Sequence, residues 1–270
     1  MSGSAPPGAA ALGHNLFPTL PVSKRWRGVV ESVADGRDAS WIADCTIRAG
    51  ARQLQAAPGN AVYREAVRLL VSIPLAARAA SFEAALRELG LPVGARPELA
   101  DLLFAAGDRL DAVATRAGLS DDFGELARRA LVAALLQRIG AELPSLLEAT
   151  PEDVRAATRR DSDPRAFTTL ARSFFAGLVA TTLSSYLDRA LAGHVGTGRR
   201  FADLGERSRF DRELRTYCHE TTRIIHEFSA GWYGRHVYGT GEMTPRAIAG
   251  YAAVALGKIL KEMERREAVP

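Results

Sequence analysis

Apolar residues recur every three or four positions between residues 206 and 232, and this period constrains the fold more than any other feature of the chain. The positions are Phe210, Leu214, Tyr217, Thr221, Ile224, Phe228 and Trp232. Because an α-helix advances about 100° per residue, this spacing gathers the side chains on one face. The sequence therefore predicts one long helix from about Glu206 to Ala230.

Similar apolar periods fill most of the chain, whereas valine and isoleucine form no alternating runs that would indicate strands. Alanine and leucine are abundant, and both lose little side-chain freedom in a helix. These observations predict an all-α fold, a multi-helix bundle with long C-terminal antiparallel helices.

Capping residues and prolines predict where the helices begin and end. Helices are expected to begin after Ser23, Asp38, Asn60, Ser81, Ser120, Thr150 and Asp163, and Pro74 is expected to end one. Residues 1–22 are rich in Pro, Gly, Ala and Ser and are expected to form a flexible arm. Residues 23–270 are expected to form a single helical domain, with a division into halves at 23–143 and 151–270 as the alternative. The looser segment 143–164 between the halves carries Arg159, Arg160, Asp161, Ser162 and Asp163.

The charge of the chain comes almost entirely from arginine. The net charge is +4, and lysine occurs only at Lys24, Lys258 and Lys261. Codon usage is one explanation. The other is recognition of phosphate or carboxylate groups, for which the planar guanidinium is suited. Both cysteines are isolated, which favours a reducing compartment. The apolar run 174–187 is short for a membrane span, so the sequence predicts a cytoplasmic protein that does not enter a membrane.

The long striped helix also carries two charged stripes. Glu206, Glu213, Glu220 and Glu227 recur every seven residues, and the arginines and histidines lie opposite the apolar face. One interpretation is a solvated face with local ion pairs, such as Arg209 with Glu213 and Arg223 with Glu227. The other is a face that docks an anionic partner. Its candidate residues are Arg199, Arg200, Arg207, Arg212, Arg215, His219, Arg223 and His226.

No metal or cofactor site is expected. His219 and Glu220 resemble the start of an HExxH zinc motif, but Arg223 occupies the position of the second histidine. His219 and His226 would lie about 10 Å apart along a continuous helix, too far to share one ion.

Residues 231–244, GWYGRHVYGTGEMT, combine four glycines with three aromatic residues. The sequence predicts a loop that either covers the bundle end or forms a small binding site. The candidate residues of this loop site are Trp232, Tyr233, Arg235, His236 and Tyr238.

Three classes of function remain open. We favour a non-catalytic helical subunit or adaptor that acts by protein–protein contacts, with another protein or a second copy of the chain as partner. The second is a nucleic-acid-associated protein that uses the arginine and histidine face. The third is a helical enzyme with a pocket near Tyr217, His219, Trp232, Tyr233 and His236.

Overall fold

The computed structural model describes residues 24–118, 122–145, 148–239 and 243–267. These residues form helices joined by turns and loops, with no strand in the described ranges. The helices are α1 (Lys24–Ala34), α2 (Ala39–Ala56), α3 (Ala61–Ala76), α4 (Phe82–Glu88), α5 (Leu99–Arg116), α6 (Asp122–Gly140), α7 (Pro151–Arg160), α8 (Pro164–Ala192), α9 (Leu204–Thr221), α10 (Arg223–Tyr238) and α11 (Pro245–Glu267), with a short 3-10 turn at Ala57–Gly59. The predicted all-α bundle is confirmed.

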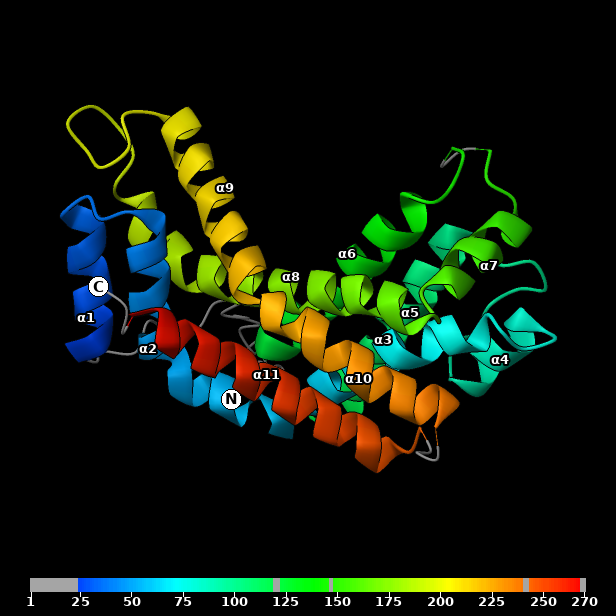
Figure 1. The fold of residues 1–270 in the computed structure, drawn as a ribbon. Coiled ribbons are helices and arrows are strands. Elements are labelled where there is room, and N and C mark those ends of the chain that lie inside the picture. Colours follow the sequence, from blue (N-terminus) through cyan, green and yellow to red (C-terminus); the bar gives the residue numbers. More distant parts are fainter. Residues whose placement is uncertain (1–23, 119–121, 146–147, 240–242, 268–270) are drawn as a thin grey trace, which may run out of the picture.

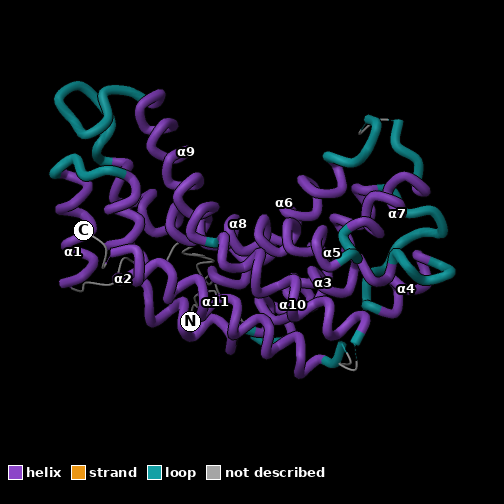
Figure 2. Tube along the Cα trace, viewed as in Figure 1, coloured by secondary structure: helices purple, strands orange, loops and turns teal. Residues whose placement is uncertain are grey.

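Helix α8 is the axis of the bundle. It crosses the middle of the molecule, with α10 and α11 running antiparallel to one another in front of it (Figure 1). Helices α1, α2 and α9 lie at one end, and α4, α5 and α7 at the other. Loops gather at these two ends, whereas the middle is almost entirely helical (Figure 2). Surface features that depend on loops and helix termini are therefore separated by the length of α8.

A single hydrophobic core cluster contains residues from both predicted halves of the chain. Phe167, Phe174 and Phe175 from α8 are fully buried in it, together with Tyr63 from α3. The Tyr63 hydroxyl donates to the carbonyl oxygen of Ala252 on α11 at 2.7 Å, so α3 and α11 are joined through the core. The division of the domain into two halves stays a prediction.

Local capping accounts for most helix starts. The side chains of Asp38, Asn60, Ser81, Thr150 and Asp163 each accept a backbone N–H from the first turn, as predicted. Ser23, Ser120 and the arm at 1–22 lie outside the described residues.

The expected helix end at Pro74 was wrong. Pro74 lies inside the last turn of α3, which continues to Ala76. A proline there removes one backbone donor. Ile73, Pro74 and Ala76 are all buried, and this packing offsets the lost hydrogen bond.

Helix α8 makes the apolar stretch longer than the run 174–187 that the sequence indicated. The apolar stretch extends over Pro164–Asp188, which is long enough by length and composition to cross a membrane. However, 67% of its most apolar window is buried inside the fold. That burial is typical of the core helix of a soluble protein.

Candidate functional site

Helix α9 keeps its predicted apolar and charged faces. Phe210, Leu214 and Thr221 are buried against α2 and α8, and the half-buried Tyr217 donates its hydroxyl to the Asp44 carboxylate on α2. On the opposite side, Arg212, Arg215 and His219 are exposed. The guanidinium groups of Arg212 and Arg215 form no hydrogen bond or ion pair with the described residues. These two arginines are thus available to an outside partner.

The three arginines upstream of this face are engaged within the fold. Arg199 donates to the carbonyl oxygen of Gly193 at 2.6 Å. Arg200 donates to the carbonyl oxygen of Arg37 at 3.1 Å, and its guanidinium lies over the Phe201 ring.

Arg207 is paired with carboxylates on both sides. Its guanidinium contacts Asp188 on α8 at 2.7 Å and Asp211 on α9 at 3.1 Å. Together with the engagement of Arg199 and Arg200, this means that the predicted arginine face does not extend from the α8–α9 loop along the helix.

The long striped helix is interrupted at Thr222, which corrects the prediction of a continuous helix through Ala230. In a continuous helix the carbonyl of His219 would accept the N–H of Arg223. Here it accepts the Thr222 hydroxyl at 2.9 Å and two donors from the Arg172 guanidinium, at 2.8 and 3.2 Å. Side chains that donate hydrogen bonds to backbone carbonyl oxygens in this way bend helices.

Just past the interruption, the buried positions lie one residue later than predicted, although Trp232 is buried as expected. The sequence placed Ile224 and Phe228 inward, but both are half-buried, while Ile225 and Ser229 are fully buried. Arg223 and His226 are exposed on α10, beyond the bend. The candidate face is therefore divided between two helices.

Arg172, on α8, is a residue that sequence reasoning missed. Its guanidinium also lies 3.1 Å from Nδ1 of His219. Partial burial and the positive charge of Arg172 together lower the pKa of His219. Since Arg223 acts on Arg172 as well, positive charge is concentrated at the bend.

The glycine-rich segment 231–244 is largely not a loop, which corrects a second prediction. Helix α10 continues to Tyr238, and residues 240–242 lie outside the described part. Trp232 and Tyr233 are buried: Trp232 stacks on Tyr251 with ring centroids 4.3 Å apart, and Tyr233 on Phe167 at 4.0 Å. The burial of two large rings outweighs the low helix propensity of the glycines beside them.

The helix then ends at Gly239. A Cβ atom there would lie 2.6 Å from the carbonyl oxygen of Arg235, so only glycine fits.

The remaining residues of the predicted loop site are dispersed around α10. His236 is half-buried, with Nδ1 2.8 Å from the carbonyl oxygen of Trp232. Arg235 is exposed and donates to the carbonyl oxygen of Gly231 at 3.3 Å. Tyr238 is 61% exposed and faces away from the core. The five residues do not enclose a common pocket.

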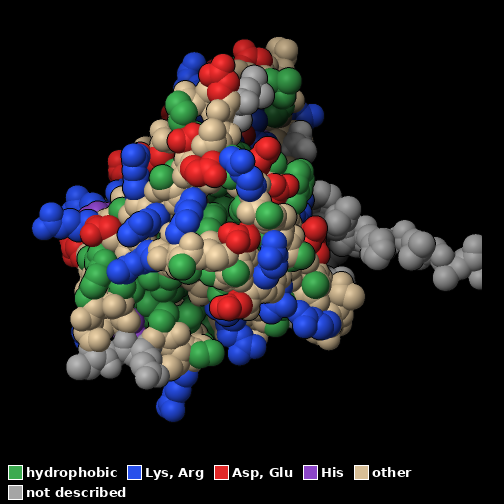
Figure 3. Space-filling view, turned by 90° about the vertical axis from the view of Figure 1, so that its right-hand side faces the viewer, with side chains coloured by type: hydrophobic (Ala, Val, Ile, Leu, Met, Phe, Trp, Pro, Cys, Tyr) green, Lys and Arg blue, Asp and Glu red, His purple; other side chains and the backbone are tan. Residues whose placement is uncertain are grey.

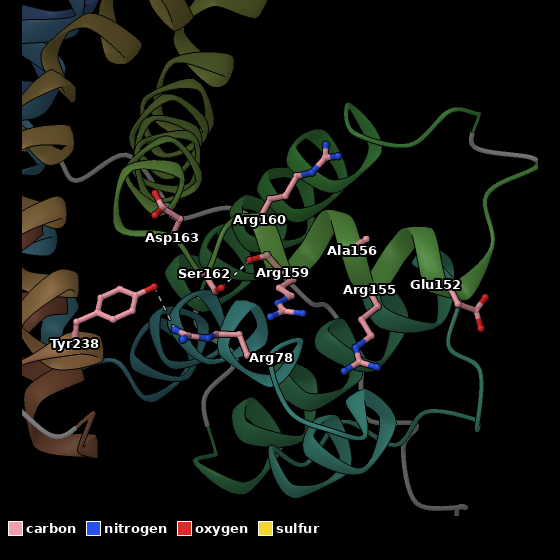
Figure 4. Close-up of a pocket in the computed structure, with 9 residues that line it drawn as sticks. All are labelled: Arg78, Glu152, Arg155, Ala156, Arg159, Arg160, Ser162, Asp163 and Tyr238. Carbon is pink, nitrogen blue, oxygen red and sulfur yellow. Dashed lines mark hydrogen bonds between the residues drawn. The ribbon is translucent and has the colours of Figure 1, made fainter.

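Tyr238 instead borders a cavity that the sequence did not predict. This cavity, of about 600 Å³, lies between α7, the turn after α3, the start of α8 and the end of α10. It is lined by Arg78, Glu152, Arg155, Ala156, Arg159, Arg160, Ser162, Asp163 and Tyr238. Figure 4 shows Arg159 and Arg155 descending from α7 and Arg78 reaching across to Tyr238. We call it the α7–α10 cavity.

Two of its arginines are held in place by the fold. Arg155 donates to the carbonyl oxygens of Ala77 and Ala79, which follow the end of α3. The Arg78 guanidinium lies over the Tyr238 ring, 5.3 Å from its centroid, and donates to its hydroxyl at 3.4 Å. In contrast, the side chain of Arg159 has no partner among the described residues.

The wall behind the cavity contains buried polar groups. The Asp161 side chain is only 3% exposed and accepts Nη2 of Arg138 at 2.8 Å. Burial raises the pKa of Asp161, and the pairing with Arg138 opposes this effect. The buried hydroxyl of Tyr233 has no hydrogen-bond partner in the described structure. The Tyr233 ring stacks on Phe167, which lies one helical turn after the lining residue Asp163 at the start of α8.

The α7–α10 cavity lies at the end of the molecule that is on the right in Figure 1, where the surface contains charged and hydrophobic side chains. Figure 3 shows basic side chains there, interspersed with hydrophobic and acidic ones. Neither His219 nor His236 lines the α7–α10 cavity or the two cavities beside α2 and α3. Within the described ranges, no three His, Cys, Asp or Glu side chains lie close enough to hold a metal ion.

Comparisons of this chain with protein-family models, with curated proteins and with solved structures found no match.

Proposed function

We propose that this protein is a non-catalytic helical subunit that binds a partner protein through the exposed side of α9. We call this side the α9 face and define it by Leu204, Glu206, Arg209, Arg212, Glu213, Arg215, His219 and Glu220, all of which are exposed. The observation that carries the proposal is the charge pattern of this face: Arg212 and Arg215, which have no ion-pair partner among the described residues, lie beside a row of glutamates.

The pattern favours a protein over a nucleic acid. Arg209, Arg212 and Arg215 are balanced by Glu206, Glu213 and Glu220, so the face has no net charge apart from His219. A phosphate backbone needs a surplus of positive charge, and the glutamates repel it. A protein surface with acidic and basic groups in complementary rows meets both stripes at once.

An apolar side chain at one end of the face supports the same conclusion. Leu204 is 74% exposed at the start of α9, on the same side of the helix as Arg212 and Arg215. Arginine is enriched in protein interfaces, and an exposed leucine at the end of the face adds apolar area that a protein partner can bury. Figure 1 shows that α9 rises from the body of the molecule at one end, where a partner can approach it.

The enzyme alternative has less support. It expects a pocket that joins His219 or His236 to a second titratable group. His219 is exposed at the bend and His236 packs on Trp232, with ring centroids 4.6 Å apart.

Charge reversal on α9 tests the proposal. The double variant Arg212→Glu/Arg215→Glu is compared with Arg165→Glu/Arg246→Glu, which makes the same change in net charge at exposed positions on α8 and α11. Proteins that co-purify with the wild-type chain from its native source, after nuclease treatment, are quantified for each variant. We expect the control variant to retain a defined partner that the α9 variant loses.

Two outcomes contradict the proposal. One is equal retention of every partner by both double variants. The other is a partner set that disappears on nuclease treatment, together with a gel shift that weakens steeply with salt, which would establish the nucleic-acid alternative.

A further inference from the structure

We infer that the α7–α10 cavity binds the phosphate group of a small organic phosphate monoester. This site lies at the opposite end of α8 from the α9 face, and the inference does not depend on the proposed function. Three properties of the cavity support the inference: the charges of its lining, the way its arginines are held, and its size.

The lining carries a surplus of two positive charges. Four arginines face two carboxylates in it. Arg160 is paired with Glu142, and Glu152 with Arg96 at 3.1 Å, so both of these side chains have partners outside the cavity. Three arginines, Arg78, Arg155 and Arg159, then remain against Asp163, and the surplus is again two.

A phosphate monoester matches this surplus. It carries between one and two negative charges at pH 7 and offers three acceptor oxygens. Guanidinium groups present forked donors that fit such oxygens, and charge-assisted hydrogen bonds of this kind are stronger than neutral ones. A single carboxylate would leave a positive charge unbalanced.

The fold holds two of the lining arginines through neutral groups rather than through carboxylates, so no ion pair within the described ranges balances their positive charges. Arg155 is fixed by the carbonyls of Ala77 and Ala79, and Arg78 is fixed over the Tyr238 ring. Arg159 approaches Arg78 from α7 without any carboxylate partner among the described residues (Figure 4). Guanidinium groups that line one cavity repel one another, and an anion between them removes that repulsion.

The size of the cavity indicates that the ligand is larger than phosphate itself. At about 600 Å³, the cavity is within the range that holds small organic molecules. The exposed Tyr238 ring forms one side of it and offers an apolar surface to the organic group. A phosphorylated peptide or a nucleic acid would need a longer groove.

Calorimetric titration of the full chain with phenyl phosphate and with inorganic phosphate tests the inference. The variant Arg159→Gln removes the unpartnered charge from the cavity. Its matched control, Arg165→Gln, makes the same change on the exposed first turn of α8, outside the lining. Both positions are exposed, so both variants should fold, which a thermal melt checks directly.

We expect phenyl phosphate to bind with one site per chain and more tightly than inorganic phosphate. Arg159→Gln should weaken binding about tenfold or more, because one charge-assisted contact is lost, while Arg165→Gln leaves it unchanged. Bound phenyl phosphate should also raise the melting temperature of the wild type and of Arg165→Gln.

Three results would overturn the inference. They are the absence of saturable binding of phenyl phosphate, an equal loss of affinity in both variants, and binding of a phosphoserine peptide at the cavity when phenyl phosphate does not bind.

Discussion

The α9 face and the α7–α10 cavity are both rich in arginine, but the fold holds their side chains in different ways. On α9, Arg212 and Arg215 are exposed, and their guanidinium groups form no hydrogen bond or ion pair with the described residues. In the cavity, Arg78 and Arg155 come from separate segments and are fixed by an aromatic ring and by backbone carbonyls. Flexible charges on an exposed helix suit a large complementary surface, whereas fixed charges around a hollow suit a small ligand.

The support behind the two regions differs as well. Behind the cavity lies the ion pair of the buried Asp161 with the half-buried Arg138. Beneath α9 lie its apolar contacts with α2 and α8. Substitutions in the two regions should therefore differ greatly in their effect on stability.

The largest effect is expected for Asp161→Ala. This change leaves the guanidinium of Arg138, whose side chain is 20% exposed, without its partner, and we expect the free energy of unfolding to fall by about 2–3 kcal/mol. Urea denaturation measures the loss. Arg212→Ala on the α9 face should change the same quantity by less than about 0.5 kcal/mol.

The paired replacement Arg138→Met/Asp161→Leu sharpens this test, because it removes both charges and should recover most of the stability. A loss of under about 1 kcal/mol for Asp161→Ala would show that the pair does not support the cavity wall.

A smaller effect is expected at the bend between α9 and α10. Arg172→Gln removes both hydrogen bonds to the His219 carbonyl oxygen, and we expect a loss of about 1 kcal/mol in the free energy of unfolding. Because Arg172 lowers the pKa of His219, the same variant should raise that pKa toward its ordinary value. Two-dimensional NMR of the imidazole protons follows the titration. The control is Arg223→Gln, which substitutes an exposed arginine near His219 on α10. It should leave the pKa of His219 unchanged.

The lowered pKa also fixes the direction of a pH effect. Between the lowered folded value and about 6.5, the ordinary value for histidine, the unfolded chain binds a proton that the folded chain does not. The contribution of neutral His219 to the free energy of unfolding is therefore fully present above about pH 6.5. It is lost as the pH falls through the pKa of His219 in the folded protein. In Arg172→Gln this dependence should be weaker. An unchanged titration of His219 in that variant would contradict the account of the bend.

The smallest effect is expected for Tyr233→Phe. The Tyr233 hydroxyl is buried without a hydrogen bond in the described structure, so its removal should change the free energy of unfolding by less than about 0.5 kcal/mol or stabilise the protein. The matched control is Tyr251→Phe, since the Tyr251 hydroxyl lies 2.7 Å from the Ser229 hydroxyl. That variant should lose about 1 kcal/mol. Equal losses in the two variants would mean that the Tyr233 hydroxyl has a partner.

The sequence predicted the helical class and most helix starts, because apolar periods and capping side chains act over a few residues. It did not predict the interruption at Thr222. Two consecutive threonines at positions 221 and 222 were a local sign of it, since threonine hydroxyls bind preceding carbonyls. The contribution of Arg172 could not be predicted, because it arrives from α8, 47 positions away in the sequence.

The candidate site was predictable only where it follows a single helix. The exposed positions of Arg212, Arg215 and His219 followed from their spacing. The α7–α10 cavity brings together Arg78 from the turn after α3, Arg159 from α7 and Tyr238 from α10, and no local sequence pattern predicts that these residues are close in space. The consecutive arginines Arg159 and Arg160, before Asp161, were the one local sequence feature that pointed to this cavity.

Amide NMR of the wild-type chain with phenyl phosphate tests most directly the claim that the two regions serve different ligands. We expect chemical-shift changes that saturate at the turn after α3, along α7, at the start of α8 and at the end of α10, with α9 unchanged. Shift changes on α9, or changes spread over basic surfaces throughout the molecule, would contradict the account.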